Sequence, residues 1–197
     1  MILWTIQTEE VYEQLMGSGI YRTDESLSLA GDIEDFKLQY DWLADKMRFL
    51  VGNPPEGVVY PVWAWHTWEG HRKRRDMRRR GYGTKGLKLI QMEIDIPDDK
   101  VMLTDFDLWV AALHGCNIDI ETEADADEDK NNLFTAVKTE RYQEYKEMII
   151  KSWDRCIGCD QKYNDLFMYK GGRSIQATFW ELKSDQVKKV WHFTCKG

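Results

Sequence analysis

The sequence predicts one α+β domain over residues 1–197, built on a mixed, mostly antiparallel sheet. A length of 197 residues fits a single domain, and no internal repeat or linker divides it. Segments with strand-like alternation fall near both ends of the chain, and segments with helical spacing lie between them. We expect about five or six strands and three or four helices.

The first elements form a strand–helix–strand opening. Residues 2–7 are apolar and β-branched, which predicts a strand. Thr8 is placed to cap a helix over residues 9–16, because two acidic residues occupy the first turn. After the glycines at 17 and 19, residues 20–22 return as a short extended piece.

The middle of the chain alternates between helices and strands. Apolar residues recur at helical spacing over residues 35–51, and aromatic residues over 58–68 indicate a strand. Residues 87–96 alternate between two faces, one of them the more polar, so they predict a strand that ends at Pro97. Residues 101–103 could add a short strand before a helix that runs to about residue 114.

The last third begins with helical periodicity and ends with strands. Residues 133–156 show the spacing of one long, mostly helical segment. Residues 175–182 and 187–193 then read as the final two strands.

The charge and hydropathy of the chain exclude some classes of protein. No run approaches the roughly 18 apolar residues of a membrane span. The first ten residues lack the basic and apolar regions of a signal peptide, so we expect a cytoplasmic protein with no membrane partner. The net charge of -7 argues against a general nucleic-acid binder.

Two segments carry opposite charge. In residues 71–80, seven of ten positions are Lys or Arg, between the strands expected at 58–68 and 87–96. This basic loop offers a site for the phosphate of a nucleotide, a dinucleotide or a nucleic acid. It could instead be a solvated loop that protects a sheet edge. Residues 119–129 are acidic at seven of eleven positions, which is typical of a solvated loop and could also cover the basic one.

The chain has nine Trp, and two of them share one face of a strand. Trp63 and Trp65 lie two residues apart in the segment 58–68, so their indoles point to the same side. They either pack in the core or form a stacking platform for a base or a nicotinamide ring.

Carboxylates give three further candidates. Gln176 and Glu181 both lie on the strand expected at 175–182, and Glu181 is on its more apolar face. Glu181 is either a charge at the rim that pairs with a Lys or Arg, or an acid of a functional site. Asp105 and Asp107 stand at a helix start, where capping is their usual role. Glu93 and Asp95 share the polar face of their strand, either as a pair or facing water and the basic loop. Each of these last four residues is a weaker candidate for a catalytic acid than Glu181 is.

The four cysteines allow a metal site but favour none. Cys156 and Cys159 form a Cys-x-x-Cys pair, and two His-containing pairs near Cys116 and Cys195 could complete a zinc site. A redox dithiol is a second alternative, and ordinary reduced cysteines are the third. No second pair with the same spacing is present, so no metal is expected.

Several segments together resemble a bacterial family of domains of unknown function. Members open with Leu-Trp-Thr-Ile-Gln, as residues 3–7 do, and carry a Pro-x-Trp-Ala-Trp segment like residues 61–65. A basic loop ending Asp-hydrophobic-Arg follows, as at residues 76–78. The segments 101–109 and 175–181 also match, so the resemblance covers nearly the whole chain. The resemblance to this family implies no established activity.

The opening of the chain is also similar, more distantly, to ADP-ribosyltransferase-like folds. In such folds an early strand carries His or Arg followed by Thr, a later strand carries Tyr or Ser, and a near-terminal strand carries Glu. Trp4 and Thr5 correspond to the first motif, Trp63 or Trp65 lies near the second, and Glu181 matches the third. The chain departs from the pattern at Trp4 and at the second motif.

The resemblance implies a divergent ADP-ribosyltransferase-like protein that uses NAD or a related nucleotide. The basic loop and Arg22 would hold the pyrophosphate, and Glu181 would assist departure of nicotinamide as the catalytic residue. The residues expected to bind the substrate are Trp4, Thr5, Gln7, Arg22, Trp63, Trp65, Arg72, Arg74, Asp76, Arg78 and Gln176.

Two alternatives stay open from the residues themselves. One is a module that binds a nucleotide or nucleic acid at the basic loop without chemistry. The other is a protein-interaction factor whose basic and acidic segments dock a partner or a second copy of the chain.

Overall fold

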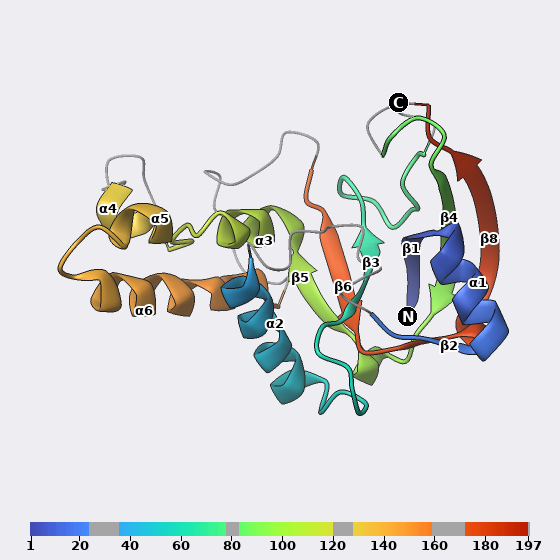
Figure 1. The fold of residues 1–197 in the computed structure, drawn as a ribbon, viewed down its shortest axis with the longest axis horizontal. Coiled ribbons are helices and arrows are strands. Elements are labelled where there is room, and N and C mark those ends of the chain that lie inside the picture. Colours follow the sequence, from blue (N-terminus) through green and yellow to red (C-terminus); the bar gives the residue numbers. More distant parts are fainter. Residues whose placement is uncertain (24–35, 78–82, 120–127, 159–171, 197) are drawn as a thin grey trace.

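The computed structural model describes residues 1–23, 36–77, 83–119, 128–158 and 172–196 (Figure 1). The strands are β1 (Ile2–Thr8), β2 (Ile20–Tyr21), β3 (Val62–Thr67), β4 (Lys88–Asp95), β5 (Met102–Asp105), β6 (Ile175–Phe179), β7 (Leu182–Lys183) and β8 (Val187–Thr194). The α-helices are α1 (Glu9–Ser18), α2 (Lys37–Leu50), α3 (Phe106–Leu113), α4 (Glu128–Asn131), α5 (Leu133–Ala136) and α6 (Tyr142–Ser152). Short 3-10 turns are η2 (Asp98–Lys100), η4 (Trp153–Cys156) and η6 (Ser184–Gln186).

Six strands form one antiparallel sheet, which confirms the predicted α+β class. Their order is β5-β6-β3-β1-β4-β8, so β1 lies near the centre and β8 at one edge. Each neighbouring pair of these strands is antiparallel. The short strands β2 and β7 pair separately in a two-stranded sheet.

The opening predicted from sequence forms as expected. The hydroxyl of Thr8 accepts a hydrogen bond from the backbone N–H of Val11, which caps α1. The helix ends at Gly19, whose φ of 79° is one that glycine adopts without steric cost. Val11 and Leu15 face inward, so α1 covers one face of the sheet, at the right of Figure 1.

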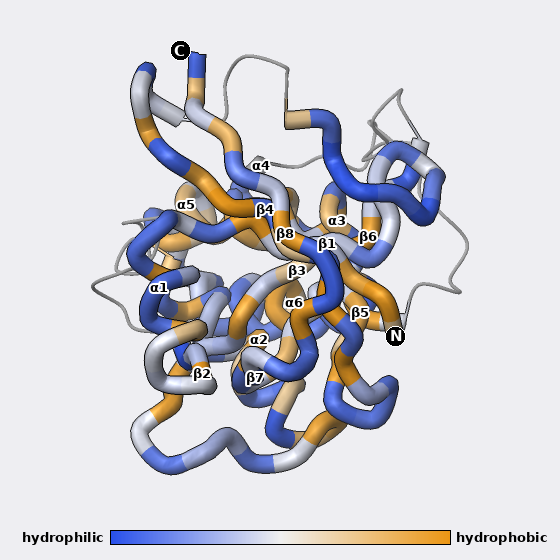
Figure 2. Tube along the Cα trace, turned by 90° about the vertical axis from the view of Figure 1, so that its right-hand side faces the viewer, coloured by the Kyte–Doolittle hydropathy of each residue, from blue (hydrophilic) through white to orange (hydrophobic). Residues whose placement is uncertain are grey.

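The face of the sheet under α1 is apolar across its width. Leu3, Met92 and Ala64 come from neighbouring strands of this face and are almost fully buried. They pack in one cluster with α1 and with the two-stranded sheet, which contributes Tyr21 and Leu182. In Figure 2 the hydrophobic stretches gather where the strands lie together, and hydrophilic stretches run along the outside.

The opposite face has two differently covered halves. Over β5, β6 and β3, helices α2, α3 and α6 build a second core that contains Trp42, Trp109 and Trp153. The helices α4, α5 and α6 extend away from the sheet at the left of Figure 1. Over β1, β4 and β8, this face of the sheet is covered by the segment that follows β3.

Three predicted elements are wrong in their bounds. The strand expected at 58–68 begins only at Val62, after a proline, which has no N–H to donate to a neighbouring strand. The strand expected at 175–182 breaks at Trp180, whose indole N–H donates to the carbonyl of Gly52 at 2.8 Å. The helix expected at 133–156 is divided into α5, α6 and η4. Its first break follows Ala136, whose carbonyl accepts from the Thr139 hydroxyl.

Candidate functional site

The basic segment, here residues 71–77, lies on the tryptophan face of the sheet. This face carries Trp4, Trp63 and Trp65, which the strand register aligns: Trp4 is opposite Trp65, and Trp63 is opposite Thr178. The segment leaves β3 and connects toward β4, as the sequence predicts. Its guanidinium groups lie over indole rings of this face rather than projecting wholly into solvent.

Arg72 is anchored at the start of the basic segment. Its Cζ lies 5.4 Å from the ring centre of Trp4, and its Nη2 donates to the carbonyl of Ile2 at 2.6 Å. A second donor, Nη1, bonds the carbonyl of His66. The indole N–H of Trp4 in turn donates to Glu93 at 3.3 Å. Arg72 is thereby fixed in place although the residue is exposed.

Arg74 and Arg75 stack on two further aromatic groups. Arg74 Cζ lies 4.5 Å from the ring centre of Trp191, and Arg75 Cζ lies 3.9 Å from that of Trp68 and 5.0 Å from that of Trp65. A cation over an indole ring is attracted by the electrons of the ring face. Three arginines and four tryptophans therefore interleave across β3, β1 and β8 and the turn after β3.

A buried amide ties the basic segment to the sheet. Gln91 is fully buried on β4, where its side-chain oxygen accepts from Arg74 Nη1 at 3.0 Å. Its side-chain nitrogen donates to the carbonyl of Arg75 at 3.3 Å. A buried amide with both ends satisfied fixes the height and register of the segment above the strand.

A cleft opens between the basic segment and the edge strand β8. Its volume is about 630 Å³, within the range of small-molecule sites. Three cationic side chains line it, from Arg74, Arg75 and Lys196, against one carboxylate, Asp76. Trp191 and Phe193 contribute aromatic surface on β8. The cleft therefore combines positive charge with flat apolar groups.

Electrostatics on this face follow from the dense positive charge. Burial, and secondarily the charge of Arg72, lowers the pKa of His66 to about 4, so His66 is neutral at pH 7. On β8, Lys189 bonds Glu93 at 2.8 Å and lowers the pKa of that carboxyl. Glu93 is thus held ionised by Lys189 and Trp4, so its resolved contacts favour a structural role.

Glu181 lies in the turn between β6 and β7, past the last residue of β6. Its Oε2 accepts from Arg22 Nη2 at 3.0 Å, and its Oε1 lies 3.5 Å from Lys183 Nζ. Arg22 follows β2, which pairs with β7, so the small sheet brings these two predicted residues together. The neighbouring Phe179 and Leu182 pack in the core beneath α1.

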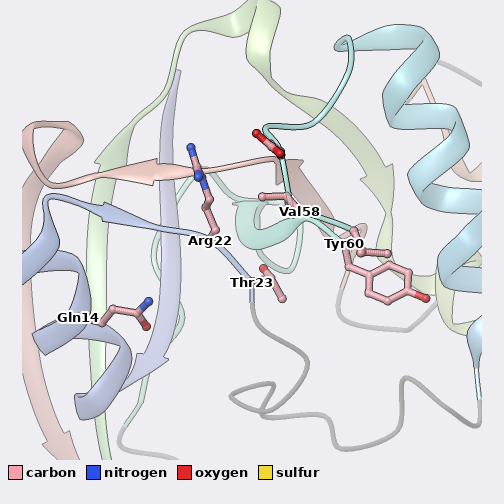
Figure 3. A pocket seen from close by; sticks show the side chains of 8 residues that line it. Gln14, Arg22, Thr23, Val58 and Tyr60 are labelled. Atoms are coloured by element: carbon pink, nitrogen blue, oxygen red, sulfur yellow. The ribbon is translucent and has the colours of Figure 1, made fainter.

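Arg22 and Glu181 line two separate clefts. Figure 3 shows the first, between Gln14 of α1 and the segment that carries Val58 and Tyr60, with Arg22 and Thr23 between them. Its volume is about 510 Å³. Glu181 lines the second, of about 320 Å³. Their ion pair therefore sits between the two clefts.

The predicted NAD site is divided by this arrangement. Trp4, Trp65, Arg72, Arg74 and Asp76 lie on or beside the tryptophan face, whereas Glu181 lies in the turn after β6 and Arg22 follows β2. Trp65 is opposite Gln176, and Glu181 comes after Phe179, at the other end of the β3–β6 pairing. Arg78 lies outside the described residues. The two groups of predicted residues do not share one cleft.

Three predicted residues have mainly structural contacts. Trp63 packs against the helical core, with its ring centre 5.6 Å from that of Trp109. Thr5 is fully buried; its hydroxyl donates to the carbonyl of Trp63 at 2.8 Å and accepts from Gln7. Gln176 is half-buried opposite Trp65 on the tryptophan face.

The cysteines and the helix-capping carboxylate behave as structural groups. Asp105 caps α3 by accepting from the N–H groups of Asp107 and Leu108, as predicted, and also pairs with Arg173 at 2.6 Å. Cys156 is buried, which raises the pKa of its thiol well above the usual range, and Cys159 lies outside the described residues. Across the part of the chain that the structure describes, no three His, Cys, Asp or Glu side chains are grouped to hold a metal ion.

Four residues of the tryptophan face were not singled out by the sequence analysis. Arg75 lies inside the basic run, and Trp68 closes the aromatic strand segment. Gln91 and Trp191 lie on strands that were predicted, but the pairing of β4 with β8 was not. Trp191 and Phe193 are two residues apart and share one face of β8, which is the signal that could have indicated Trp191.

Comparison with protein families gives one clear result. The model of the family described as "Domain of unknown function (DUF3841)" matches residues 2–188. The chain belongs to this family. No match to a curated protein is found. Of the helices in the described residues, none is long and apolar enough to cross a membrane.

Proposed function

We propose that this DUF3841 protein is a binding module for a nucleotide phosphate, either free or within a single-stranded nucleic acid. The ligand binds along the basic segment and in the cleft beside β8. Binding, rather than chemistry, is the function that the contacts of this face support best.

The interleaving of arginine and tryptophan carries the proposal. A guanidinium group has five N–H donors. Arg72 uses two of them on backbone carbonyls and Arg74 uses one on Gln91, while both residues remain exposed. The stacked rings hold the side chains in place, so little side-chain entropy is lost when a phosphate accepts from the remaining donors.

The cleft beside β8 supplies the second part of such a site. Trp191 and Phe193 offer apolar rings, and Arg74 lies over the first of them. A base can stack on an aromatic ring or on a guanidinium plane. Lys196 adds another positive charge beside the same cleft. A nucleotide thus finds donors for its phosphate and surface for its base within one site.

The experiment measures the affinity of the protein for two probes, fluorescein-labelled oligothymidylate and ADP as its competitor. Arg74→Ala removes one stacked cation and should weaken oligothymidylate binding about tenfold, because a charged hydrogen bond contributes about 1.5–3 kcal/mol. Affinity should also fall steeply with added salt if several phosphates are bound. If ADP displaces oligothymidylate at a lower total concentration of phosphate groups than the oligonucleotide supplies, the free nucleotide is the better ligand.

Arg141→Ala is the matched control. Arg141 also lies over an aromatic ring, that of Tyr145 at 4.9 Å, but on α6 and away from the basic segment. The control should bind both probes as the wild type does. Equal affinity of the Arg74→Ala variant and the wild type, or no binding of either probe, would contradict the proposal.

A second candidate function is the NAD-dependent transfer suggested by the distant ADP-ribosyltransferase resemblance. One observation favours it: Glu181 lines a cleft and forms ion pairs with Arg22 and Lys183. In that reaction the bond between nicotinamide and ribose breaks, its electron pair stays on the nicotinamide nitrogen, and an acceptor takes the ribose carbon. Glu181 would stabilise the positive charge that develops on the ribose.

Nicotinamide release from NAD tests this second candidate. Glu181→Gln should abolish release, and Glu144→Gln, at an exposed helix position paired with Arg141, should leave it unchanged. Release that persists in Glu181→Gln, or no release by the wild type with cell extract as a source of acceptors, would reject it.

A further inference from the structure

The cleft lined by Glu181 has the composition of a small-molecule pocket. Its volume of about 320 Å³ is at the lower end of the range for ligand sites. Six apolar residues form most of its lining: Val51, Pro55, Ile96, Pro97, Phe179 and Trp180. The cleft shares no lining residue with the one beside β8, so it is an independent site.

The floor of this cleft is rigid. Ile96, Phe179 and Trp180 are 2%, 1% and 6% exposed. The indole N–H of Trp180 is fixed by the carbonyl of Gly52 at 2.8 Å. Because the floor comes from the end of β4, from β6 and from the residue after it, several elements hold it in shape. A ligand would meet a surface that is already formed.

The rim of the cleft is polar and carries an excess of positive charge. Lys100 and Lys183 line it together with Glu181. Glu181 is also paired with Arg22, which lies on the neighbouring cleft, so its negative charge is compensated from outside. Lys183 Nζ lies 3.5 Å from Glu181 Oε1, and Lys100 Nζ lies 3.6 Å from Asp99 Oδ2. Both lysine side chains are at least half exposed, and exposed ion pairs contribute little free energy, so an acid group can replace these contacts.

Two amide side chains complete the rim. The oxygen of Gln186 accepts from the backbone N–H of Lys183 at 2.8 Å, which orients the amide. Within the described part of the chain, the NH₂ group of Gln186 makes no hydrogen bond, and the same holds for the side chain of Asn53. These groups can donate to an acid group that lies between the lysines.

We propose that this cleft binds a small organic anion with an apolar or aromatic body and a single acid group. The body packs over Trp180 beside Val51 and Pro55, and the acid group lies at the rim with Lys100 and Lys183. The inference does not rest on the function proposed above, because it uses neither the basic segment nor any chemistry at Glu181.

Titration of ¹⁵N-labelled protein with phenylacetate tests the proposal. The indole signal of Trp180 should shift and saturate, because a ring that enters the cleft contacts this side chain. Phenylacetamide, which has the same body without the charge, should bind about tenfold more weakly. Phenyl phosphate tests the acid group: whichever of the two anions binds more tightly identifies the preferred one.

Two variants and a control locate the acid group. Lys100→Gln and Lys183→Gln should each weaken phenylacetate binding about fivefold to tenfold and leave the other indole signals in place. Lys138→Gln, at a position that does not line the cleft, should have no effect. Equal affinity for phenylacetate and phenylacetamide, or no movement of the Trp180 signal at millimolar phenylacetate, would overturn the proposal.

Discussion

In the two halves of the tryptophan face, different groups cover the indole rings. Trp63 and Trp65 lie two residues apart on β3 with their rings on one side of the sheet. Trp63 is covered by the helical core, where its ring meets Trp109 and Tyr40. Trp65 is covered by Arg75 of the basic segment and by the rings of Trp68 and Phe106. Trp63 is thus partly buried against apolar side chains, whereas Trp65 is buried beneath a cation and two aromatic rings.

The difference separates stability from recognition. Apolar packing removes water from the helical half and stabilises the fold. The half capped by the basic segment keeps Trp4 and Trp65 buried while it presents guanidinium donors at the surface, so it can bind an anion without refolding. We therefore expect substitutions in the helical half to unfold the protein, and substitutions in the capped half to change ligand binding.

Trp153→Ala should give the largest loss of stability. Trp153 is fully buried, lies edge-on to Trp42, and donates to the carbonyl of Cys116 at 3.0 Å. Truncation leaves a cavity and an unpaired carbonyl, so we expect the free energy of unfolding to fall by about 3–5 kcal/mol. Urea denaturation measures this loss. Phe134→Ala, at a residue that is 55% exposed, is the control, and a similar small loss in both would refute the comparison.

Lowering the pH should reduce the free energy of unfolding, because His66 resists protonation in the folded protein. The pKa of this imidazole is lowered to about 4 in the folded protein, from 6.5. Between these two values the unfolded chain binds a proton that the folded one does not, so stability falls as the pH is lowered through this range. Solvent screening of a half-buried group reduces the expected loss to about 1–2 kcal/mol.

His66→Asn isolates this effect from other titrating groups. Urea midpoints measured at pH 7 and pH 5 should differ less for the variant than for the wild type. Equal differences for the two proteins would mean that His66 is not protected from protonation.

A double-mutant cycle on Arg74 and Trp191 should reveal the smallest effect. Stacking of a partly exposed cation on indole contributes about 0.5–1 kcal/mol. The interaction energy comes from the unfolding free energies of the wild type, Arg74→Ala, Trp191→Ala and the double variant. The same cycle on Arg141 and Tyr145 should give less, because that stack lies on an exposed helix. A coupling of zero at Arg74 would show that the stack is incidental.

The sequence predicts local structure better than it predicts which residues meet. The Thr8 cap, the Asp105 cap and the strand β4 depend on neighbouring residues, and each formed as expected. The polar face expected for β4 is wrong at Gln91, which is fully buried because the basic segment covers it. The bounds of β3 and β6 depended on Pro61 and on the contact of Trp180 with Gly52, which local periodicity does not contain.

The candidate site was predictable in composition but not in arrangement. The basic run and the paired tryptophans were visible as patterns along the chain. Their contact with Trp191 requires the pairing of β4 with β8, and the pairing of Arg22 with Glu181 requires that of β2 with β7. These are long-range pairings, so no short window of the sequence could show that Glu181 and the basic segment line different clefts.

The indole region of a ¹⁵N–¹H spectrum, recorded during titration with oligothymidylate and then with ADP, tests the central claim most directly. The account predicts that the signals of Trp191, Trp4 and Trp65 shift and saturate with at least one of the two probes. It predicts that the signals of Trp42, Trp109 and Trp153 stay in place. Shifts confined to this second group, or no shift with either probe, would contradict it.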